Sequence, residues 1–591
     1  MEQIKEFFSA LFSQLGSVTE SVGFAEGYNA VARFVFPVLA FLIVYRCAKS
    51  LLSFRKEPEI WAWLCLPDGT RLPVTHWENI IGRSKRSDLV IDVPTISRSH
   101  AVLTRYDDGS WSISDVGSRG GVFVNGARTN MAAITINDTL SLGGIEMYLE
   151  PITHRQEVIQ ASSRTKAGRV ITPGATLFLL TLLQALVLLQ LLLQSDAEYL
   201  RSVFISFVGL AAVEWILFFV TRLMRRSGFE METLAFFLST VGMTVITSKI
   251  HSELISSTAT IKKLVALILS IILYVAIIWS LRDLERAKKI RYLAAAAGIG
   301  LLLINIALGV VKYGAMNWIE IGGISFQPSE LVKVCFIFAG ASTMDRIVAK
   351  RNLILFIGYS AVICGCLAWM SDFGTALIFF VCFLVIAYLR SGSFAGIALI
   401  CAGTGFAGVL AAKFRPYILE RFSTWGHVWD DPLGSGFQQT RSLMCIASGG
   451  LVGLGLGRGW LKYVAASDTD LVFAFVSEEW GLLVAVMMVA VLVIMGVFVL
   501  KAASMGRSSF YTIGACAAMS IMITQTILNV FGTVDLLPLT GVTFPFVSNG
   551  GSSMMASWGL LAFIKAADTR QNASVAVRLP SRKEAQDEQD I

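Results

Sequence analysis

Four carboxylates crowd the start of one apolar run, in the stretch AASDTDLVFAFVSEEWGLL at residues 465–483. Asp468 and Asp470 come directly before the run, and Glu478 and Glu479 lie inside its start. Carboxylates are costly near hydrocarbon, so those found there are commonly paired or functional. Asp470 can act as a general base, bind a cation, or serve as a helix N-terminal acid with Ser467, Asp468 or Thr469 as the N-cap. This pattern alone leaves these alternatives open.

The two glutamates point in different directions if the helix is continuous from Asp470. Glu478 would then be rotated by about 80° from Asp470 around the helix axis, and Glu479 by about 180°. They cannot both face the same site. Because unpaired burial of a charge is expensive, one of them is expected to pair with a cation on a neighbouring helix and brace the structure.

Composition predicts an integral membrane protein. The chain has 591 residues, is 55% hydrophobic with only 15% charged residues, and has a mean hydropathy of +0.65. Its repeated apolar runs are long enough to cross a bilayer, and no cleavable signal is evident at the N-terminus. The nine cysteines are scattered and show no zinc-binding pattern. A net charge of +7 is modest, and no nucleic-acid partner is expected.

The fold class expected from these patterns is a polytopic α-helical membrane protein of about thirteen spans with an inserted all-β domain. Short alternating strands separated by turn signals such as PDGT and VNGAR predict the β sandwich. The expected organisation is an extracytoplasmic segment 1–29, a first span 30–52, a cytoplasmic β domain 58–152, a linker 153–171, early spans 172–289, a membrane core 290–566 with an outer loop 414–470, and a cytoplasmic tail 567–591.

The distribution of Lys and Arg among the connections sets the expected orientation. Basic connections such as TRLMRRSG, RDLERAKKIR and DRIVAKRN alternate with connections that are less basic. If the basic connections are cytoplasmic, successive connections alternate between the two sides of the membrane along the whole chain. The β domain and the C-terminus are then cytoplasmic, and the four carboxylates lie at the outer surface of the membrane.

The β domain carries Gly82-Arg83, Ser97-Arg98-x-His100 and the segment DVGSRGGVFVNG. With these pieces it resembles a forkhead-associated (FHA) domain, a sandwich that binds phosphothreonine peptides through loops at one end. The resemblance implies that Arg83 and Ser97 contact phosphate, while His100 braces the loop. Arginines suit this role because they hold phosphate by charge-assisted hydrogen bonds.

Two further arginines, Arg98 and Arg119, complete the expected phosphopeptide-binding set. The sequence departs from the FHA pattern at Gly120, where the family usually has Asn, and at Val122, where it has Thr. Arg119 offers a compensating charge. The domain is either a phosphothreonine reader, which implies a phosphorylated partner and a Ser/Thr kinase pathway, or a degenerate protein-docking module.

Four further segments are rich in glycine, proline and polar residues beside apolar runs: GAMNWIEIGGISFQPSELVKV (314–334), SDFGTA (371–376), GSGFQQTRSLMCIASGGLVGLGLG (434–457) and LLPLTGVTFPFVSNGGSS (536–553). Together with the stretch at 465–483 they resemble the SEDS family, the RodA/FtsW/SpoVE-type proteins of bacterial cell-wall synthesis. The resemblance covers about 290–566 and keeps the family order of motifs. It implies a bacterial plasma-membrane polymerase that builds peptidoglycan strands from lipid II at the outer face and works with a class B penicillin-binding protein.

Lipid II polymerisation needs a base near the attacking hydroxyl, charge that balances the pyrophosphate, and a groove for the lipid. Asp470 matches the aspartate of the family's HTDF motif, so the resemblance implies that it is the general base or a cation ligand in an inverting transfer that releases undecaprenyl pyrophosphate. Asp468 stands where the family has His. It makes the local charge more negative, which suits a divalent cation such as Mg²⁺ or Mn²⁺. No organic cofactor is expected.

Other polar side chains near these motifs are candidates for a substrate cavity. Lys333 lies one turn after Glu330, so the two form either an intrahelical ion pair or part of the cavity lining. Asp372, at the start of a span, is either an N-cap acid or a cavity residue. Ser548 and Asn549 precede a glycine-rich helix N-terminus suited to anions, and Asn549 replaces the family's Tyr.

Two outer arginines and one glutamate complete the candidates. Arg421 and Arg441 flank the motif loop, where they would hold pyrophosphate or sugar or else be ordinary surface residues. Glu478 is a candidate cavity residue as well as a brace.

Two functions other than an enzyme agree with a membrane protein of this kind. A transporter of lipid-linked precursors would need polar groups at both faces, whereas the motifs cluster on the outer one. A non-catalytic scaffold would recruit a penicillin-binding protein without any need for Asp470. The sequence therefore favours the enzyme.

Overall fold

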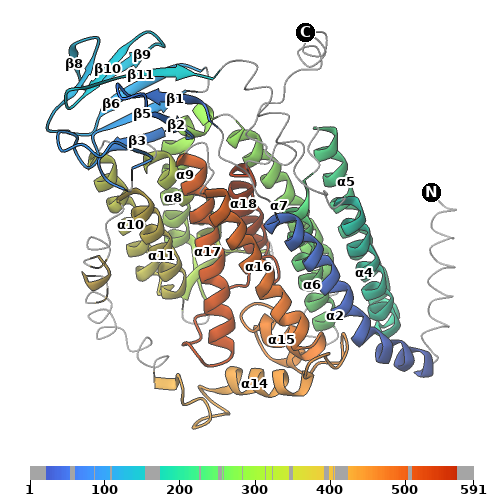
Figure 1. The fold of residues 1–591 in the computed structure, drawn as a ribbon. Coiled ribbons are helices and arrows are strands. Elements are labelled where there is room, and N and C mark those ends of the chain that lie inside the picture. The colour runs from blue at the N-terminus through green and yellow to red at the C-terminus, as the bar shows by residue number, and fades with distance from the viewer. Residues whose placement is uncertain are drawn as a thin grey trace, which may run out of the picture.

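The protein is described by a computed structural model that covers residues 22–53, 60–152, 173–224, 228–250, 258–312, 315–344, 350–391, 423–503 and 509–568, with short internal gaps and a few isolated positions besides. The helices of these residues are α2 (Val22–Leu52), α4 (Pro173–Gln194), α5 (Ala197–Leu223), α6 (Glu230–Ile250), α7 (Ala259–Leu281), α8 (Leu284–Leu308), α9 (Pro328–Met344), α10 (Lys350–Trp369), α11 (Phe373–Ser391), α14 (Phe437–Gly449), α15 (Val472–Glu479), α16 (Leu482–Ala503), α17 (Ser509–Thr533) and α18 (Gly551–Ala566), with a 3-10 turn η1 at Leu461–Tyr463. Most of them run side by side in one bundle (Figure 1).

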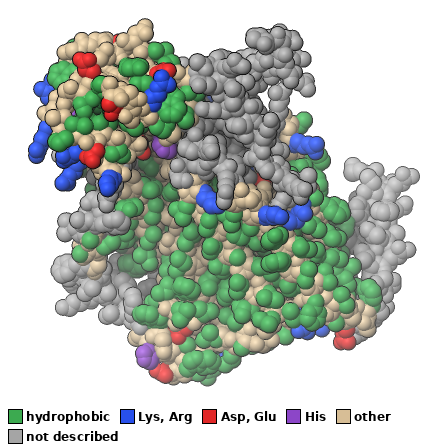
Figure 2. Space-filling view, viewed as in Figure 1, with side chains coloured by type: hydrophobic (Ala, Val, Ile, Leu, Met, Phe, Trp, Pro, Cys, Tyr) green, Lys and Arg blue, Asp and Glu red, His purple; other side chains and the backbone are tan. Residues whose placement is uncertain are grey.

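The bundle has the character of a membrane domain. Eight of the described helices are long and apolar enough to span a bilayer. Figure 2 shows a broad band of hydrophobic side chains around the bundle, with Lys and Arg near the border that faces the β domain. The polytopic helical fold is confirmed. The number of about thirteen spans stays a prediction, since the run expected at 395–413 lies largely outside the described residues.

Helices α6 and α18 form the centre of the bundle. Every residue of α6 is buried, and α18 packs against α7, α9 and α17. The indole of Trp558 in α18 packs edge-on against Phe236 of α6 and Tyr274 of α7, with ring centroids 4.9 and 5.4 Å away. Helices buried on all sides are typical of the core of a large bundle.

The β domain is a two-sheet sandwich, as expected. Its strands are β1 (Ala62–Cys65), β2 (Arg71–Val74), β3 (Glu78–Gly82), β4 (Leu89–Val90), β5 (Ala101–Arg105), β6 (Trp111–Asp115), β7 (Val122–Val124), β8 (Ala127–Thr129), β9 (Met131–Ile134), β10 (Thr139–Leu142) and β11 (Ile145–Pro151). One sheet has the order β2-β1-β11-β10-β7-β8 and the other β4-β3-β5-β6-β9. Alternate residues such as Leu64, Ile113 and Leu140 point inward and form the buried core between the sheets.

The apolar run expected as one span at 471–500 is two helices. Helix α15 ends at Glu479, and α16 begins at Leu482 after a break at Gly481, whose φ is +91°. A side chain at Gly481 would also collide with the carbonyl of Leu451, so the break requires glycine. Because α15 begins at Val472, the rotations expected for a helix continuous from Asp470 do not apply.

Two segments expected as loops contain regular structure. A small antiparallel sheet is formed by the strands β12 (Val310–Lys312), β13 (Ala315–Ile321) and β14 (Ile324–Phe326). The amide of Met316 in β13 donates to the carbonyl of Met370, just after α10, at 3.0 Å. The described part of the segment expected as an outer loop contains α14 and η1, which lie with α15 at the end of the bundle opposite the sandwich (Figure 1).

The sandwich and the bundle touch through α17. Ser509, the first residue of α17, donates its hydroxyl to the carboxylate of Glu78 in β3 at 2.9 Å. Nearby, Lys501 at the end of α16 donates to the carbonyl of Leu52 at the end of α2, at 2.7 Å. The β domain therefore rests on the helix ends rather than only being tethered by its linkers.

Candidate active site

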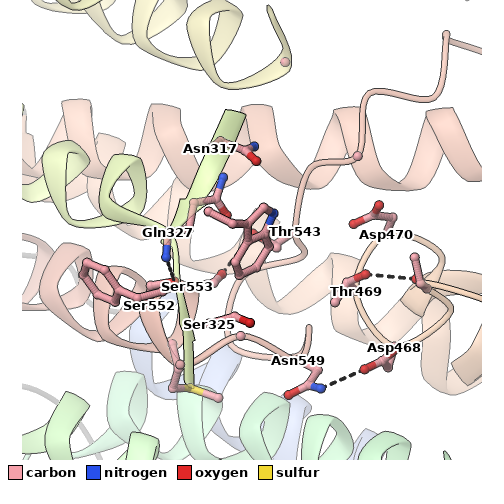
Figure 3. A pocket seen from close by; sticks show the side chains of 18 of the residues that line it. Asn317, Ser325, Gln327, Asp468, Thr469, Asp470, Thr543, Asn549, Ser552 and Ser553 are labelled. Atoms are coloured by element: carbon pink, nitrogen blue, oxygen red, sulfur yellow. Dashed lines mark hydrogen bonds between the residues drawn. The ribbon is translucent and has the colours of Figure 1, made fainter. Parts of the chain in front are cut away.

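A cavity of about 1520 Å³ lies among the ends of α6, α7, α11 and α18 and the segments that connect them. Figure 3 shows its polar lining, with the loop that carries Asp468 and Asp470 on one side and β13–β14 on the other. The polar side chains around it include Lys249, Lys262, Lys263, Asn317, Gln327, Asp372, Asp468, Asp470, Thr543, Asn549, Ser552 and Ser553.

One wall of the cavity is apolar and opens outward. It includes Val265 and Leu269 on α7 and Leu377 on α11. These three side chains are 49%, 50% and 43% exposed although they belong to membrane-type helices. The cavity thus joins a polar end to a surface suited to hydrocarbon chains.

Asp470 lies in the loop before α15, and its backbone is held from α17. The side-chain amide of Asn529 donates to the carbonyls of Asp470, at 3.0 Å, and Val542, at 2.8 Å. The amide of Asp470 donates to the carbonyl of Ala466 at 2.9 Å. The N-cap position of α15 is Leu471, without a side-chain cap, so the alternative in which Ser467, Asp468 or Thr469 caps a helix at Asp470 does not hold. Asp470 is half-buried and lines the cavity, as a general base must.

Asp468 is buried and ion-paired. Its Oδ1 accepts from Nζ of Lys249 on α6 at 2.5 Å, and its Oδ2 accepts from Nδ2 of Asn549 at 2.8 Å. The amide of Asn549 also donates to the carbonyl of Asp468 at 2.8 Å. The expected excess of negative charge is therefore wrong, since Lys249 balances it. The two positions at which the site departs from the SEDS pattern, 468 and 549, contact each other (Figure 3).

These contacts do not favour a resident cation held jointly by Asp468 and Asp470. Both oxygens of Asp468 are engaged, and a metal there would have to displace Lys249. Within the ranges that the structure describes, no three His, Cys, Asp or Glu side chains come together as a set of metal ligands.

Asp372 fills both roles that the sequence left open. Its Oδ1 accepts from the amide of Thr375 at 3.1 Å, which caps the start of α11, and its Oδ2 accepts from Nδ2 of Asn317 at 3.0 Å. Asp372 and Asn317 line the cavity, whereas Thr375 does not. Asp372 thus positions the amide of Asn317, on β13, at the polar end of the cavity.

The start of α18 faces the cavity. The helix begins at Gly551, directly after Asn549 and Gly550, and the hydroxyls of Ser552 and Ser553 line the same wall. Ser552 Oγ accepts from the amide of Gln327 at 3.3 Å. Free amides and the helix dipole make such a terminus favourable for anions, as expected for the SNGGSS segment.

Two lysines on the first turn of α7 add positive charge beside this terminus. Lys262 is exposed, whereas Lys263 is buried and donates from Nζ to the carbonyls of Gly242, at 2.7 Å, and Val547, at 2.9 Å. A Cβ at Gly242 would lie 2.8 Å from that nitrogen, so glycine makes room for it. The buried cation is held by backbone carbonyls at the edge of the cavity.

Other candidates have structural roles. Lys333 and Glu330 form a buried intrahelical ion pair at 2.7 Å, and neither lines the cavity. Arg441 packs its guanidinium over the rings of Phe437 and Trp460, with centroids 5.1 and 5.9 Å away, and is absent from the lining. Arg421 lies outside the described residues.

Ser548 and Glu478 brace the loops around the site. Ser548 donates to the carbonyl of Thr469 at 2.6 Å. Glu478 accepts from the amides of Trp460, at 2.8 Å, and Leu461, at 2.9 Å, at the start of η1. Glu478 is therefore not a cavity residue.

Glu479 faces away from the cavity, toward α6. Its carboxylate accepts from the hydroxyl of Ser248 at 2.7 Å. Neither glutamate forms an ion pair with a described residue, so the expectation that one of them pairs with a cation is wrong. Glu478 accepts from two backbone amides, and Glu479 accepts from a hydroxyl at only one of its two oxygens. Both glutamates hold neighbouring segments together, in agreement with the expected bracing role.

The β sandwich brings its predicted phosphate-binding residues to one end. The amide of Arg83 donates to the carbonyl of Ser97 at 3.0 Å, and the amide of Arg119 donates to its hydroxyl at 3.1 Å. Arg83, Arg98 and Arg119 are all exposed. Three arginines around one hydroxyl therefore offer a positive surface for a phosphate.

His100 braces this end, as expected. It is fully buried, its Nδ1 accepts from the amide of Ser97 at 3.1 Å, and its Nε2 therefore carries the proton that it donates to the carbonyl of Gly121 at 3.0 Å. A Cβ at Gly120 would lie 3.1 Å from Cα of Gly143, so the larger residue usual in the family would crowd this neighbour.

Lys249 and Lys263 were not predicted as site residues from the sequence. Both lie at the ends of apolar helices, where lysines ordinarily extend to the membrane surface. Their partners lie 219 and 284 residues away in the chain. Charge balance was the available signal, because the sequence near 470 carries more carboxylates than cations.

Comparisons with known proteins cover both parts of the chain. Residues 228–573 match the family model for the FtsW, RodA and SpoVE cell cycle proteins, and residues 79–143 match the model for the FHA domain. The chain is 30% identical over 319 residues to peptidoglycan glycosyltransferase RodA of Mycobacterium tuberculosis (strain ATCC 25618 / H37Rv), covering 49% of this chain and 66% of that protein, just under two thirds.

Two further relatives give similar values. The chain is 33% identical over 285 residues to the probable peptidoglycan glycosyltransferase FtsW of Tolumonas auensis, covering 46% of this chain and 74% of the relative. It is 30% identical over 273 residues to stage V sporulation protein E of Bacillus subtilis (strain 168), covering 43% and 71%. All three alignments are shorter than the helical part of this chain.

Proposed function

The chain belongs to the FtsW, RodA and SpoVE family of cell cycle proteins, and from this membership we propose that it is a peptidoglycan glycosyltransferase that polymerises glycan strands from lipid II. It is a multi-pass membrane protein with an FHA domain. The observation that supports the proposal is the cavity, whose lining combines Asp470 with polar side chains and with exposed apolar side chains of α7 and α11. Relatives with this fold are named peptidoglycan glycosyltransferases.

Asp470 is suited to accept the proton of the attacking sugar hydroxyl. In the proposed reaction that hydroxyl oxygen bonds to the anomeric carbon of a second lipid-linked sugar, the bond from this carbon to the pyrophosphate oxygen breaks, and undecaprenyl pyrophosphate leaves. Attack opposite to the leaving group inverts the anomeric centre. Asn529 holds the backbone of Asp470, so the carboxylate needs little rearrangement before the proton moves.

Charge on the leaving pyrophosphate needs compensation more than protonation, because pyrophosphate is itself a good leaving group. The amides at the start of α18 and the lysines Lys262 and Lys263 supply positive potential on one wall of the cavity. Any divalent cation would then arrive with the pyrophosphate and meet Asp470, rather than reside at Asp468. The apolar opening beside Val265 and Leu377 suits the polyprenyl chain.

The proposed orientation places this cavity at the outer face of the bacterial plasma membrane and the FHA domain and C-terminus in the cytoplasm. Lys and Arg near the border that faces the sandwich support it (Figure 2). The cavity lies toward the opposite end, beside the loop before α15. A class B penicillin-binding protein is the proposed partner, because crosslinking must follow polymerisation.

The FHA domain is proposed to bind a phosphothreonine-bearing protein under control of a Ser/Thr kinase. The exposed Arg83, Arg98 and Arg119 around Ser97 support this role. Direct contact between Glu78 and Ser509 gives the domain a route to α17, whose other end carries Asn529 beside Asp470. Deletion of the kinase is expected to change either the partners or the activity of the protein.

The test is polymerisation of purified lipid II by the full chain in detergent, alone and with a class B penicillin-binding protein. The expected result is glycan strands that lengthen with time, resolved by gel electrophoresis. Movement of lipid II across vesicles without polymer would identify a transporter instead. Absence of polymer in both conditions, from protein that still binds the penicillin-binding protein, would identify a scaffold.

A further inference from the structure

The buried ion pair between α6 and the loop before α15 has no part in the reaction as described above. Lys249 and Asp468 are 3% and 6% exposed, and Lys249 also donates from Nζ to the hydroxyl of Ser467, at 3.0 Å, and the carbonyl of Val464, at 3.3 Å. A charge pair taken out of water at this depth stabilises a structure only when its geometry is well satisfied. Lys249, at the end of α6, is thus held by three acceptors that all belong to the segment 464–468.

We propose that Lys249, Asp468 and Asn549 form a positioning unit that sets the place of Asp470 in the cavity. The inference rests on the proposed function, because Asp470 is taken as the base. None of the three needs to touch the reacting atoms. Their role is to hold the segment that carries the base against α6 on one side and against the start of α18 on the other.

The backbone contacts connect this unit to Asp470. The carbonyl of Asp468 accepts from the amide of Asn549 at 2.8 Å, that of Thr469 accepts from Ser548 Oγ at 2.6 Å, and that of Asp470 accepts from Asn529 Nδ2 at 3.0 Å. Three successive carbonyls are thus held by α17 and the segment before α18. A shift of Asp468 would displace Asp470, only two residues away.

Both the side chain and the backbone of Asp468 are held by other segments of the protein. Asn549 binds it through both its side chain and its amide, and Lys249 occupies the second carboxylate oxygen. A neutral residue at 468 would keep the contacts with Asn549 but leave Lys249 without its anion. Removal of Lys249 would instead leave a buried carboxylate without its cation, two residues from Asp470.

This asymmetry predicts a signature in the pH dependence of the reaction. An unbalanced negative charge at 468 disfavours the ionised form of a neighbouring carboxylate, and an unbalanced positive charge at 249 favours it. The acid limb of the pH–rate profile therefore moves to higher pH in Lys249→Met and to lower pH in Asp468→Asn. The other charged groups that line the cavity are Lys262, Lys263 and Asp372, and none of them is substituted in any variant. Lys263 interacts electrostatically with Asp468, so the loss of this anion in Asp468→Asn acts on Lys263 as well as on Lys249. Lys462 in η1 and Glu479 in α15 are likewise left in place.

The experiment compares the full chain with Lys249→Met, Asp468→Asn, the double variant and Lys249→Arg, using lipid II polymerisation at several pH values. Misplacement of a catalytic group by about 1 Å costs about 100-fold in rate, so Lys249→Met is expected to lose about that factor in kcat with KM for lipid II little changed. The double variant is expected to regain about tenfold over Lys249→Met, because coupled pairs are not additive. Lys249→Arg is expected to keep most of the activity.

A matched control separates positioning from general stability. Lys565 and Glu232 form another buried ion pair, at 2.9 Å, which lies away from the cavity lining. Lys565→Met is expected to lower the thermal stability in detergent without moving the acid limb. Thermal unfolding of every variant identifies any that does not fold, and Asp468→Asn then carries the test alone through its shift of the acid limb to lower pH.

Two results would overturn the proposal while leaving the proposed function intact. One is a double variant whose loss is the product of the two single losses. The other is an acid limb at the same pH in the wild type, Lys249→Met and Asp468→Asn. If the wild type itself makes no polymer, the proposed function fails instead, and the unit is then judged by non-additivity of the same variants in thermal unfolding.

Discussion

Asn529 offers a direct way to move the backbone of Asp470 without changing any charge. It is buried, and its side-chain amide donates to the carbonyls of Asp470 and Val542. Asn529→Leu keeps a similar volume but removes both hydrogen bonds. The substitution should therefore affect the position of Asp470 and the stability of the loop before α18 at the same time.

The magnitude follows from the two carbonyls that lose their donor. A buried polar group left unsatisfied costs about 1–3 kcal/mol, and this full range applies at the buried Val542. The carbonyl of Asp470 keeps a second donor, the hydroxyl of Thr533 at 3.4 Å, so its cost is smaller, about 0.5–1 kcal/mol. The sum is a loss of about 1.5–4 kcal/mol in the free energy of unfolding. A displacement of Asp470 by about 1 Å would lower kcat by about 100-fold.

The assay combines thermal unfolding in detergent with initial rates of lipid II polymerisation over a range of lipid II concentrations. Thr526→Val, one turn earlier on α17, is the control, since its hydroxyl bonds only to the carbonyl of Met522 in its own helix, at 2.8 Å. This control should keep kcat. An Asn529→Leu protein that folds and retains the wild-type kcat would refute the reasoning about the backbone of Asp470, as would a loss confined to KM.

Three further predictions concern other parts of the chain. Gly481→Ala forces a side chain into a left-handed conformation and against the carbonyl of Leu451, so it should lower the unfolding free energy by at least about 1–2 kcal/mol, as melting in detergent would show. Arg83→Ala should weaken binding of a phosphothreonine peptide by about tenfold or more, and equal binding of the unmodified peptide by the wild type would contradict phosphate recognition. Hydrogen bonds from a neighbouring amide and from a threonine lower the pKa of Asp138 below its ordinary 3.8. The stability it contributes is present above pH 3.8 and is lost as the pH falls through the lower folded value. The protection of amides in its loop, measured relative to the intrinsic exchange rate at each pH, should therefore fall there and stay constant between about pH 5 and 7.

The sequence predicted the parts of this protein whose signals are local. Alternating strands and turn residues identified the sandwich, and the order of short motifs identified the helical core. Asp470, Asp372 and Asn549 were predicted to face the cavity because each lies beside a helix start within such a motif, and all three do.

Contacts between distant segments were not predictable in the same way. Nothing near Lys249 in the sequence indicates a carboxylate partner 219 residues later, and a lysine at a helix end is ordinarily at the membrane surface. Glu330 and Lys333 have the spacing of an ion pair as well as the polarity of a cavity, and only the packing around α9 decides between them. The break at Gly481 was not predicted, because the apolar run continues across it.

The central claim is that Asp470 acts as the base in strand polymerisation, and the most direct measurement is the turnover rate of Asp470→Asn at saturating lipid II, with lipid II binding measured separately. Asp430→Asn, at an exposed position before α14, is the control for the loss of a carboxylate outside the cavity. General base catalysis contributes about 10²–10⁴-fold, so the variant should lose at least about 100-fold in turnover while binding lipid II within about threefold of the wild type. Equal polymer from Asp470→Asn and the wild type would contradict the account.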